Sequence, residues 1–324
     1  MYRYGRLNVA GAILSKRKIQ VLVEGTTVEV KGPDGTVEKK TIPPAVRGWD
    51  DPRLLTLVAI RRRGVPAQAI LNFVTELGVT DAQTNIQVLR FEAVIRKYLE
   101  RTVPRLMLVL DPILVTIEDV PDDYVEELTI PYDPKKPDGD SRPVPFTKKI
   151  YIDSSDFREE DSSEFFRLAP GKTVGLLNAP FAITATSYTK DENGVITEIK
   201  ATKAEGVKPK AYIHWVASSG TRVVARQYNS LFLSEEPNAL DWKSGGYAED
   251  LNPNSEVPWP NAIIEPSFNL LRKGHSDKPS GSSDDLVRFQ AVRTGYFSID
   301  PEAEDGKAVL NQIVTLKEDA GKGK

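Results

Sequence analysis

The sequence predicts a multidomain α+β protein in which a small helical domain precedes two antiparallel β-barrels. Apolar residues between Trp49 and Pro104 recur with the period of amphipathic helices. After Arg105 the pattern changes to many short alternating runs, separated by loops rich in Pro, Asp, Asn and Ser. Short strands in irregular order are typical of barrels, and the length of this region allows two of them.

The first segment of the chain forms no complete unit in this interpretation. Up to Val23 the pattern indicates a short strand, a basic loop and the start of a helix. Two alternating stretches then flank the turn Gly32-Pro33-Asp34-Gly35, which predicts a β-hairpin within residues 24–46. We expect this hairpin to be an excursion from a larger scaffold.

Capping residues mark the first two helices of the helical domain. Asp51-Pro52 supplies an N-cap followed by proline, and Gly64 is suited to a helix end, so we expect a helix over about 52–63. Pro66 opens the next helix and Gly78 closes it.

The third helix is expected over about 86–99, after the N-cap Asn85. Leu89 and Ile95 are predicted to lie on its buried face. These three helices complete the helical domain.

The remaining two thirds of the chain carries the predicted strands. The turn Asp191-Glu192-Asn193-Gly194 predicts a hairpin, because Asn-Gly tolerates positive φ angles. The predicted strands are Leu106–Leu110, Leu114–Ile117, Lys149–Ile152, Ala182–Thr189, Val195–Ala201, Ala211–Val216, Arg222–Arg226, Thr294–Ile299 and Ile313–Leu316.

The composition excludes several classes of site. The chain has no cysteine, so it has no disulfide or thiolate metal site, and its two histidines, His214 and His275, leave little for a metal centre. We expect no metal-binding residues. No run of about 18 apolar residues and no signal-peptide core is present, so we expect a cytoplasmic protein without a membrane partner.

The net charge of -3 conceals two regions of opposite sign. Residues 1–105 carry 18 Lys or Arg and 10 Asp or Glu, a net of +8, whereas residues 106–324 carry 25 and 36, a net of -11. The basic first third indicates contact with a polyanion, since neutralised phosphates release counterions. In the acidic remainder, RNA contact should depend on a few well-positioned groups.

The first candidate site residues belong to a basic motif, Ile13-Leu14-Ser15-Lys16-Arg17-Lys18. A solvated loop is the ordinary interpretation of such a cluster. The segments before and after this motif favour another interpretation. Together with Tyr4-Gly5-Arg6-Leu7-Asn8, Gly48-Trp49-Asp50-Asp51-Pro52-Arg53 and Arg61-Arg62-Arg63-Gly64, the motif resembles the class I glutamyl- and glutaminyl-tRNA synthetase family, in particular its glutaminyl members.

The resemblance continues in the order of the family across most of the chain. Its later motifs are Val103-Pro104-Arg105-Leu106-Met107-Leu108-Val109-Leu110-Asp111-Pro112, Ser141-Arg142-Pro143-Val144-Pro145-Phe146, Asp156-Phe157-Arg158-Glu159, Ile213-His214-Trp215-Val216 and Gly295-Tyr296-Phe297. It implies a remnant of the class I catalytic domain over 1–48, a tRNA-docking helical domain over 49–104, a proximal barrel over 105–207 plus 299–324, and a distal barrel over 208–298.

The resemblance also implies an ATP site, since Ser15 and Lys16 match the Lys-Met-Ser-Lys-Ser loop. Lys16 would stabilise the ATP phosphates as charge develops, and Arg6 and Leu7 would lie beside the adenosine. The full enzyme would use ATP and Mg²⁺. No His-Ile-Gly-His loop is present, because neither histidine has a partner three residues away. We therefore expect an N-terminal catalytic half to be missing, and the chain alone to bind no cofactor and to be inert.

The expected partner is a glutamine-specific tRNA. By position in the family, Arg105, Arg167 and Gln290 would read the anticodon loop, and splayed loop bases suit such donors and acceptors. Arg53, Arg61 and Arg62 would contact the inner face of the L-shaped tRNA. Without the resemblance, exposed Arg and Gln are ordinary surface residues, and a salt-bridged helix face is an equal alternative for the arginines.

We expect the chain to be a monomer. Two other functions stay open. One is the same portion of a eukaryotic-type glutamyl-tRNA synthetase. The other is a β-barrel interaction module without an RNA role, which the acidic C-terminal region favours. Gly171-Lys172-Thr173 resembles the end of a P-loop but lacks its first glycine, so we expect a turn there. His214, in an apolar run, is expected to be structural.

Overall fold

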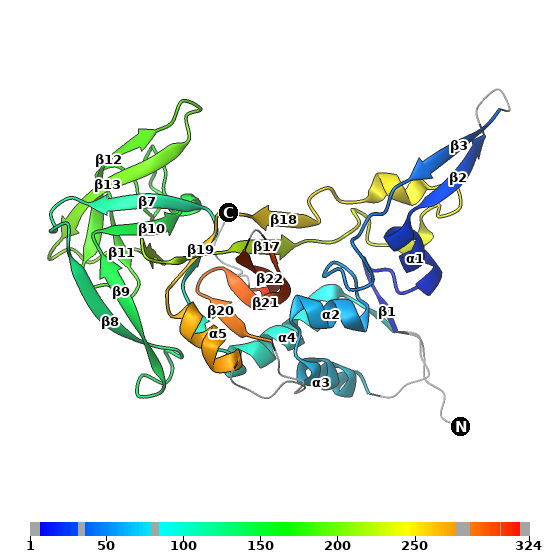
Figure 1. The fold of residues 1–324 in the computed structure, drawn as a ribbon, viewed down its shortest axis with the longest axis horizontal. Helices are drawn as coiled ribbons and strands as arrows, with labels where there is room; N and C mark the ends of the chain where they lie inside the picture. The colour runs from blue at the N-terminus through cyan, green and yellow to red at the C-terminus, as the bar shows by residue number, and fades with distance from the viewer. Residues whose placement is uncertain (1–6, 32–35, 79–83, 277–285, 305, 318–324) are drawn as a thin grey trace.

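The computed structural model describes residues 7–31, 36–78, 84–276, 286–304 and 306–317. Within them the chain is a mixed α/β protein with few helices and many strands (Figure 1). The hairpin of β2 (Thr26–Lys31) and β3 (Val37–Ile42) lies at one end of the long axis. The largest sheet lies at the other end, with the helices and a second large sheet between them.

The N-terminal elements agree with the sequence patterns. β1 (Leu7–Val9) pairs in parallel with β4 (Thr84–Ile86), and α1 (Lys16–Glu24) follows the basic loop. The predicted hairpin is present as β2 and β3, although its turn at residues 32–35 lies outside the described residues.

Two of the three predicted helices end where their glycines indicated. α2 (Leu57–Arg63) ends at Gly64, whose φ of 102° is in the left-handed region. Only glycine fits there, since a Cβ on Gly64 would lie 2.2 Å from Cβ of Ser298. α3 (Ala67–Leu77) starts after Pro66 and ends at Gly78.

Other helix predictions were wrong. α2 begins after Thr56, whose hydroxyl accepts a hydrogen bond from the Ala59 N–H, and not at Asp51-Pro52. The Asp51 carboxylate binds Arg47 and Arg53 instead. α4 (Val88–Thr102) begins after Gln87, not Asn85. Ile95 is buried as expected, but Leu89 is 72% exposed.

The first large sheet has the strand order β14-β11-β12-β13-β7-β10-β15. Its two edge strands are separated in the chain only by His214 and Trp215, so the sheet must curl until its edges approach each other. Its strands are β7 (Pro112–Ile117), β10 (Lys149–Asp153), β11 (Thr173–Leu176), β12 (Ala182–Lys190), β13 (Ile196–Ala204), β14 (Tyr212–Ile213) and β15 (Val216–Ala217).

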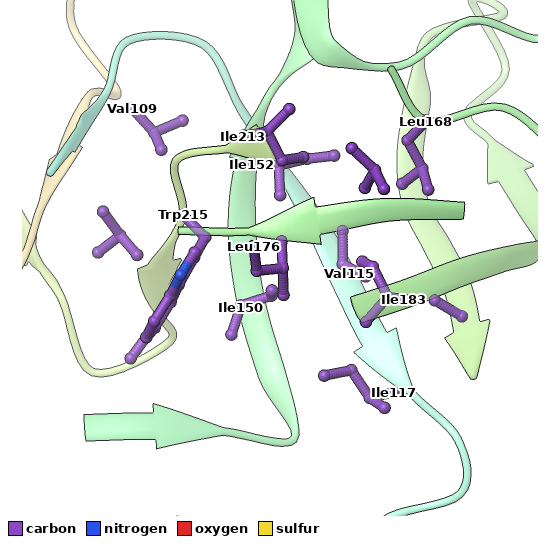
Figure 2. Close-up of a cluster of buried hydrophobic side chains, with 14 of the residues drawn as sticks. Val109, Val115, Ile117, Ile150, Ile152, Leu168, Leu176, Ile183, Ile213 and Trp215 are labelled. Carbon is purple, nitrogen blue, oxygen red and sulfur yellow. The ribbon is translucent and has the colours of Figure 1, made fainter. Parts of the chain in front are cut away.

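Apolar side chains fill the inside of this curled sheet (Figure 2). Val115 and Ile150 are register partners on β7 and β10, and both are fully buried. Trp215 contributes the largest buried side chain and donates from its indole N–H to the Leu177 carbonyl, 2.9 Å away. The hairpin of β8 (Val125–Pro131) and β9 (Ser141–Thr147), which the sequence patterns did not predict, packs Phe146 against this tryptophan.

The second large sheet has the order β18-β17-β22-β21-β20-β5. A smaller sheet, β16-β19-β6, adjoins it. In the second large sheet, β21 and β22 contact α2, and β20 and β22 contact α4. The strands are β5 (Arg105–Leu106), β6 (Leu108–Val109), β16 (Thr221–Arg222), β17 (Val224–Tyr228), β18 (Glu256–Trp259), β19 (Ile263–Ile264), β20 (Arg288–Ala291), β21 (Gly295–Glu304) and β22 (Lys307–Thr315).

The expectation of two antiparallel barrels is confirmed only in part. Both large sheets are mixed: β7 pairs in parallel with β13, and β5 with β20. Among the described residues no ladder of strand pairs closes either sheet. The sheets also group the strands differently from the expected ranges, since β21 crosses the expected boundary at 298 and belongs wholly to the second sheet.

Short helices complete the structure. η1 (Ser154–Asp156) follows β10, and α5 (Phe268–Ser276) follows β19. η2 (Pro237–Ala239) and η3 (Gly246–Asp250) lie in the long connection between β17 and β18, which reaches from the second sheet to α1 (Figure 1). No helix in the described ranges is both long and apolar enough to cross a membrane.

Candidate functional site

The basic motif forms the start of α1. Ser15 is the residue before the helix, and Lys16 is its exposed first residue. The first turn contains basic side chains and no acidic one. This is unusual, because a helix N-terminus favours anions and disfavours cations. The arrangement therefore favours an anionic ligand. Leu7 begins β1 beside Thr84, whereas Arg6 lies outside the described residues.

The connection between β17 and β18 holds this motif from the other side. The Gly11 N–H donates to the Glu235 carbonyl at 2.7 Å, and Lys18 Nζ donates to the Asn238 carbonyl at 2.8 Å. A cleft of about 560 Å³ remains between the two segments, lined in part by Ser15 and Lys18. Lys16 does not line this cleft, although it directly follows Ser15, which does.

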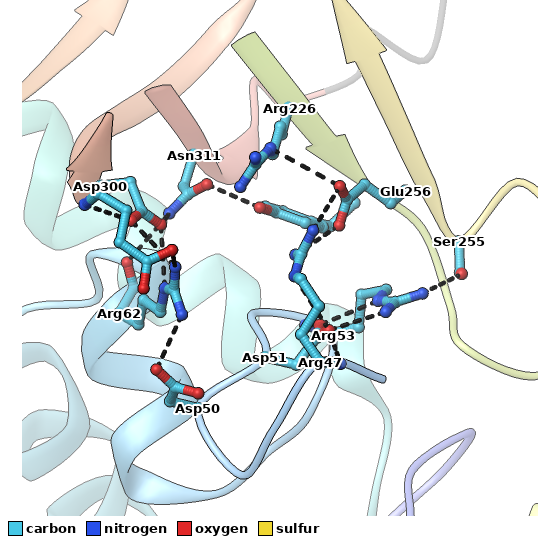
Figure 3. Close-up of polar contacts among 12 residues, drawn as sticks. Arg47, Asp50, Asp51, Arg53, Arg62, Arg226, Ser255, Glu256, Asp300 and Asn311 are labelled. Carbon is cyan, nitrogen blue, oxygen red and sulfur yellow. Dashed lines mark hydrogen bonds and ion pairs between the residues drawn. The ribbon is translucent and has the colours of Figure 1, made fainter. Parts of the chain in front are cut away.

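Two of the arginines expected to contact tRNA bind carboxylates within the protein (Figure 3). Arg53 donates to both oxygens of the buried Asp51, at 2.9 and 2.7 Å. Arg62 donates to Asp50, Asp300 and Glu302, and its side chain is only 10% exposed. These contacts match the salt-bridged alternative and connect α2 to β21.

The three consecutive arginines have different surroundings. Arg61 is exposed, and no ion pair with it is found in the described part of the chain. Arg63 donates to the Gln312 carbonyl at 3.1 Å and lies over the Tyr228 ring. Burial lowers the pKa of Arg63, against the opposing effect of Glu92. Of these arginines, only Arg61 is available to a phosphate.

Two of the three expected anticodon readers are neighbours. Gln290 on β20 is the register partner of Arg105 on β5, and the Gln290 N–H donates to the Pro104 carbonyl at 2.8 Å. Leu106 and Phe289, adjacent in sequence to these two residues, are fully buried in the core of the second sheet. Because side chains alternate along a strand, Arg105 and Gln290 share the opposite face. Both are partly exposed there.

The third expected reader, Arg167, lies in the first sheet's half of the molecule. Its Nη1 donates to the Ser155 carbonyl at 2.9 Å, and its Nε is 3.3 Å from the Asp156 carboxylate. The side chain is still 42% exposed. Its guanidinium is therefore oriented by the protein and remains accessible to a ligand.

Sequence reasoning missed the partners of Arg167. Asp156 is buried and accepts hydrogen bonds from both Arg293 Nη1 and Nη2, at 2.6 and 2.8 Å. Asp156 lies within a motif of the family resemblance, but no local pattern pairs it with Arg293, because the contact joins η1 to the turn between β20 and β21. The sequence around Asp156 carries no signal of its burial, which only the structure shows.

Other candidates have structural roles. His214 is buried, and its Nδ1 lies 3.0 Å from Arg293 Nη1, so it is a structural residue as expected. Gly171 is in a left-handed turn before β11, which agrees with the prediction of a turn. No group of side chains suited to a metal ion is found among the described residues.

Comparison with known proteins covers nearly all of the sequence. Residues 1–101 match the family "tRNA synthetases class I (E and Q), catalytic domain". Residues 103–204 and 212–300 match two families that are each described as the anti-codon binding domain of these synthetases.

Individual relatives agree with these matches. The chain is 48% identical over 327 residues to the glutamine–tRNA ligase protein virJ of Hypocrea virens, covering 98% of the chain and 47% of the relative. It is 45% identical to the glutamine–tRNA ligase of Saccharomyces cerevisiae, over 98% and 40%. The cytoplasmic glutamine–tRNA ligase of Arabidopsis thaliana is 37% identical, over 100% and 38%. The chain thus spans less than half the length of these relatives. It belongs to the class I glutamyl- and glutaminyl-tRNA synthetase family.

Proposed function

We propose that this chain is the tRNA-docking and anticodon-reading portion of a cytoplasmic glutamine–tRNA ligase. One observation carries the proposal: Arg105 and Gln290 are register partners on a partly exposed sheet face. They come from two segments that match the two anticodon-binding families. Arg167, in the first of these segments, would supply a third polar group, and the names of the relatives favour glutamine over glutamate.

The chemistry fits a single-stranded RNA loop. A glutamine amide offers one donor and one acceptor, complementary to N3–H and O4 of uracil, and a guanidinium suits a guanine edge or a phosphate. Reading unpaired bases needs such groups on a rigid support. The second sheet provides this support, because Phe289 and Leu106 anchor both strands in its core.

In the whole enzyme, the Lys16 loop would act on ATP. We propose that ATP and Mg²⁺ activate glutamine there, with Ser15 and Lys16 beside the phosphates and Arg6 and Leu7 beside the adenosine. A His-Ile-Gly-His half would be needed for this step, so the chain alone should show no ATP–pyrophosphate exchange with glutamine. We further propose a monomer in which each of the two large sheets forms one anticodon-binding barrel.

Titration with two anticodon stem-loops tests the reading function. A stem-loop with a glutamine anticodon should bind more tightly than one with a glutamate anticodon, and affinity should fall as salt rises. Tighter binding of the glutamate stem-loop would favour a eukaryotic-type glutamyl-tRNA synthetase. Absence of salt-dependent binding to either RNA would favour an interaction module without an RNA role.

A further inference from the structure

One buried carboxylate connects the two large sheets beside the proposed anticodon readers. Asp156 ends η1, directly after β10 of the first sheet. It accepts two hydrogen bonds from Arg293, at 2.6 and 2.8 Å, in the bidentate geometry that a guanidinium and a carboxylate favour. The same carboxylate lies 3.3 Å from Arg167 Nε. A single group thus holds two arginines from different parts of the chain.

Arg293 belongs to the turn that follows Gln290. This turn connects β20 to β21, and Arg293 has a φ of 66°, a conformation that non-glycine residues seldom adopt. The contact with Asp156 therefore fixes the end of the strand that carries Gln290. It fixes that strand relative to the segment between β10 and β11, in which Arg167 lies.

His214 completes the surroundings of Arg293. Burial, followed by the charge of Arg293, lowers the pKa of His214, so its ring is neutral near pH 7. Its Nδ1 can then accept a hydrogen bond from Arg293 Nη1, 3.0 Å away. With Asp156 and His214 both held inside the protein, Arg293 has little freedom to move.

The three charged groups leave a net positive charge, because two guanidiniums face one carboxylate. The excess is available at Arg167, since Arg293 uses both of its terminal nitrogens on Asp156. Arg167 is the more exposed of the two, at 42% against 28%. Asp156 therefore orients Arg167 without covering it.

We propose that Asp156 is a positioning residue for RNA reading: by holding Arg167 and Arg293 together, it sets how Arg167 and Gln290 are placed relative to each other. This inference rests on the proposed function. It assigns to Asp156 an effect on base selectivity that a purely structural ion pair would not have. The placement of Arg167 relative to Gln290 should change when the carboxylate loses its charge.

The test compares Asp156→Asn with Arg167→Ala. The RNA probes are a stem-loop with a glutamine anticodon and three variants, each with one anticodon base replaced. Arg167→Ala should lower selectivity by about tenfold at one of the three positions. Asp156→Asn should lower it at the same position, and the double variant should lose no more selectivity than Arg167→Ala alone.

Two further variants separate positioning from folding. Asp300→Asn removes another buried charge that pairs with an arginine, Arg62, away from the readers, so it should lower the melting temperature and leave selectivity unchanged. Arg293→Lys keeps the charge beside Asp156 and loses the bidentate geometry, so it should fold and lose selectivity at the Arg167 position.

The outcomes are distinct. If Asp156→Asn lowers stability but keeps full selectivity, Asp156 has only a structural role and the inference is overturned. If Asp156→Asn does not fold, the same result in Arg293→Lys overturns the inference. Equal loss at all three positions in Asp156→Asn and Asp300→Asn also overturns it, because that result indicates general loosening. If the unaltered chain binds all four RNAs alike, the proposed function itself fails.

Discussion

Gln290 and Arg105 face each other on the parallel strands β20 and β5, although they come from opposite ends of the β-rich region. The two side chains lie on the face opposite Phe289 and Leu106, which are buried in the core of the second sheet. A rigid pair of polar groups therefore stands at a partly exposed face. This pair is therefore accessible to an RNA loop.

Removal of the Arg61 side chain should weaken RNA binding, whereas removal of the Arg62 side chain should lower the stability of the fold. Arg61→Ala removes an exposed cation with no ion-pair partner in the described ranges, so RNA affinity should fall and its salt slope should drop by about one, with unchanged stability. Arg62→Ala leaves the buried Asp300 without its cation and should cost about 3 kcal/mol of stability. Salt-series titrations and denaturant unfolding measure both. Equal stability loss in both variants would contradict this division.

Asp51 should make stability depend on acid pH. Burial alone would raise its pKa, but hydrogen bonds from Arg53 and from the Arg47 N–H lower it from 3.8 to about 2. A depressed pKa stabilises the fold above the unfolded value of 3.8, and the effect is lost as the pH falls through about 2. Asp51→Asn should therefore cost about 2 kcal/mol at pH 7, and its difference from the unaltered chain should shrink below pH 4. Urea unfolding at several pH values measures this, and a pH-independent difference would exclude the charge as the cause.

Lys16 should affect adenylate formation and leave tRNA binding nearly unchanged. In a chain joined to a class I nucleotide-binding domain, Lys16→Ala should slow ATP–pyrophosphate exchange about a hundredfold, because a phosphate contact that strengthens as charge moves is lost. Arg17→Ala is the matched control, since Arg17 is the exposed neighbour on the same helix turn. An unaltered rate in Lys16→Ala would make Lys16 a solvated surface charge.

Arg105→Ala should weaken binding of every stem-loop, if its guanidinium also contacts phosphate. The salt slope should then fall by about one unit for cognate and non-cognate loops alike. Titrations of two stem-loops at several salt concentrations measure it. A loss confined to the glutamine stem-loop would exclude the phosphate contact and leave Arg105 with base reading alone.

Local patterns predicted much of the fold, where the deciding interactions are close in sequence. Gly64 and Gly78 end helices, and the Asn193-Gly194 turn joins β12 to β13, because backbone conformation at these positions depends on the residue itself. The expected helix cap at Asp51 is wrong, because the sequence does not distinguish its true partners, Arg47 and Arg53, from other nearby charges.

Contacts between distant segments could not be predicted in this way. Three such contacts depend on how distant strands and turns come together. They are the pairing of Arg105 with Gln290, the contact of Asp156 with Arg293, and the ion pair of Arg62 with Asp300. The family resemblance proposed Arg62 for tRNA contact, and the sequence alone could not show which of three consecutive arginines is exposed. The fold distinguishes them by direction: Arg61 points outward, Arg62 meets Asp300, and Arg63 packs against β22.

The most direct test of the anticodon-reading claim is the affinity of Gln290→Ala for two stem-loops that differ only in the central anticodon base. If the amide pairs with uracil, the variant leaves a base edge unpaired and should bind the glutamine stem-loop about 1–3 kcal/mol more weakly. Binding of the stem-loop with another central base should hardly change. Equal loss for both RNAs would contradict the reading role and leave Gln290 as a structural residue of the second sheet.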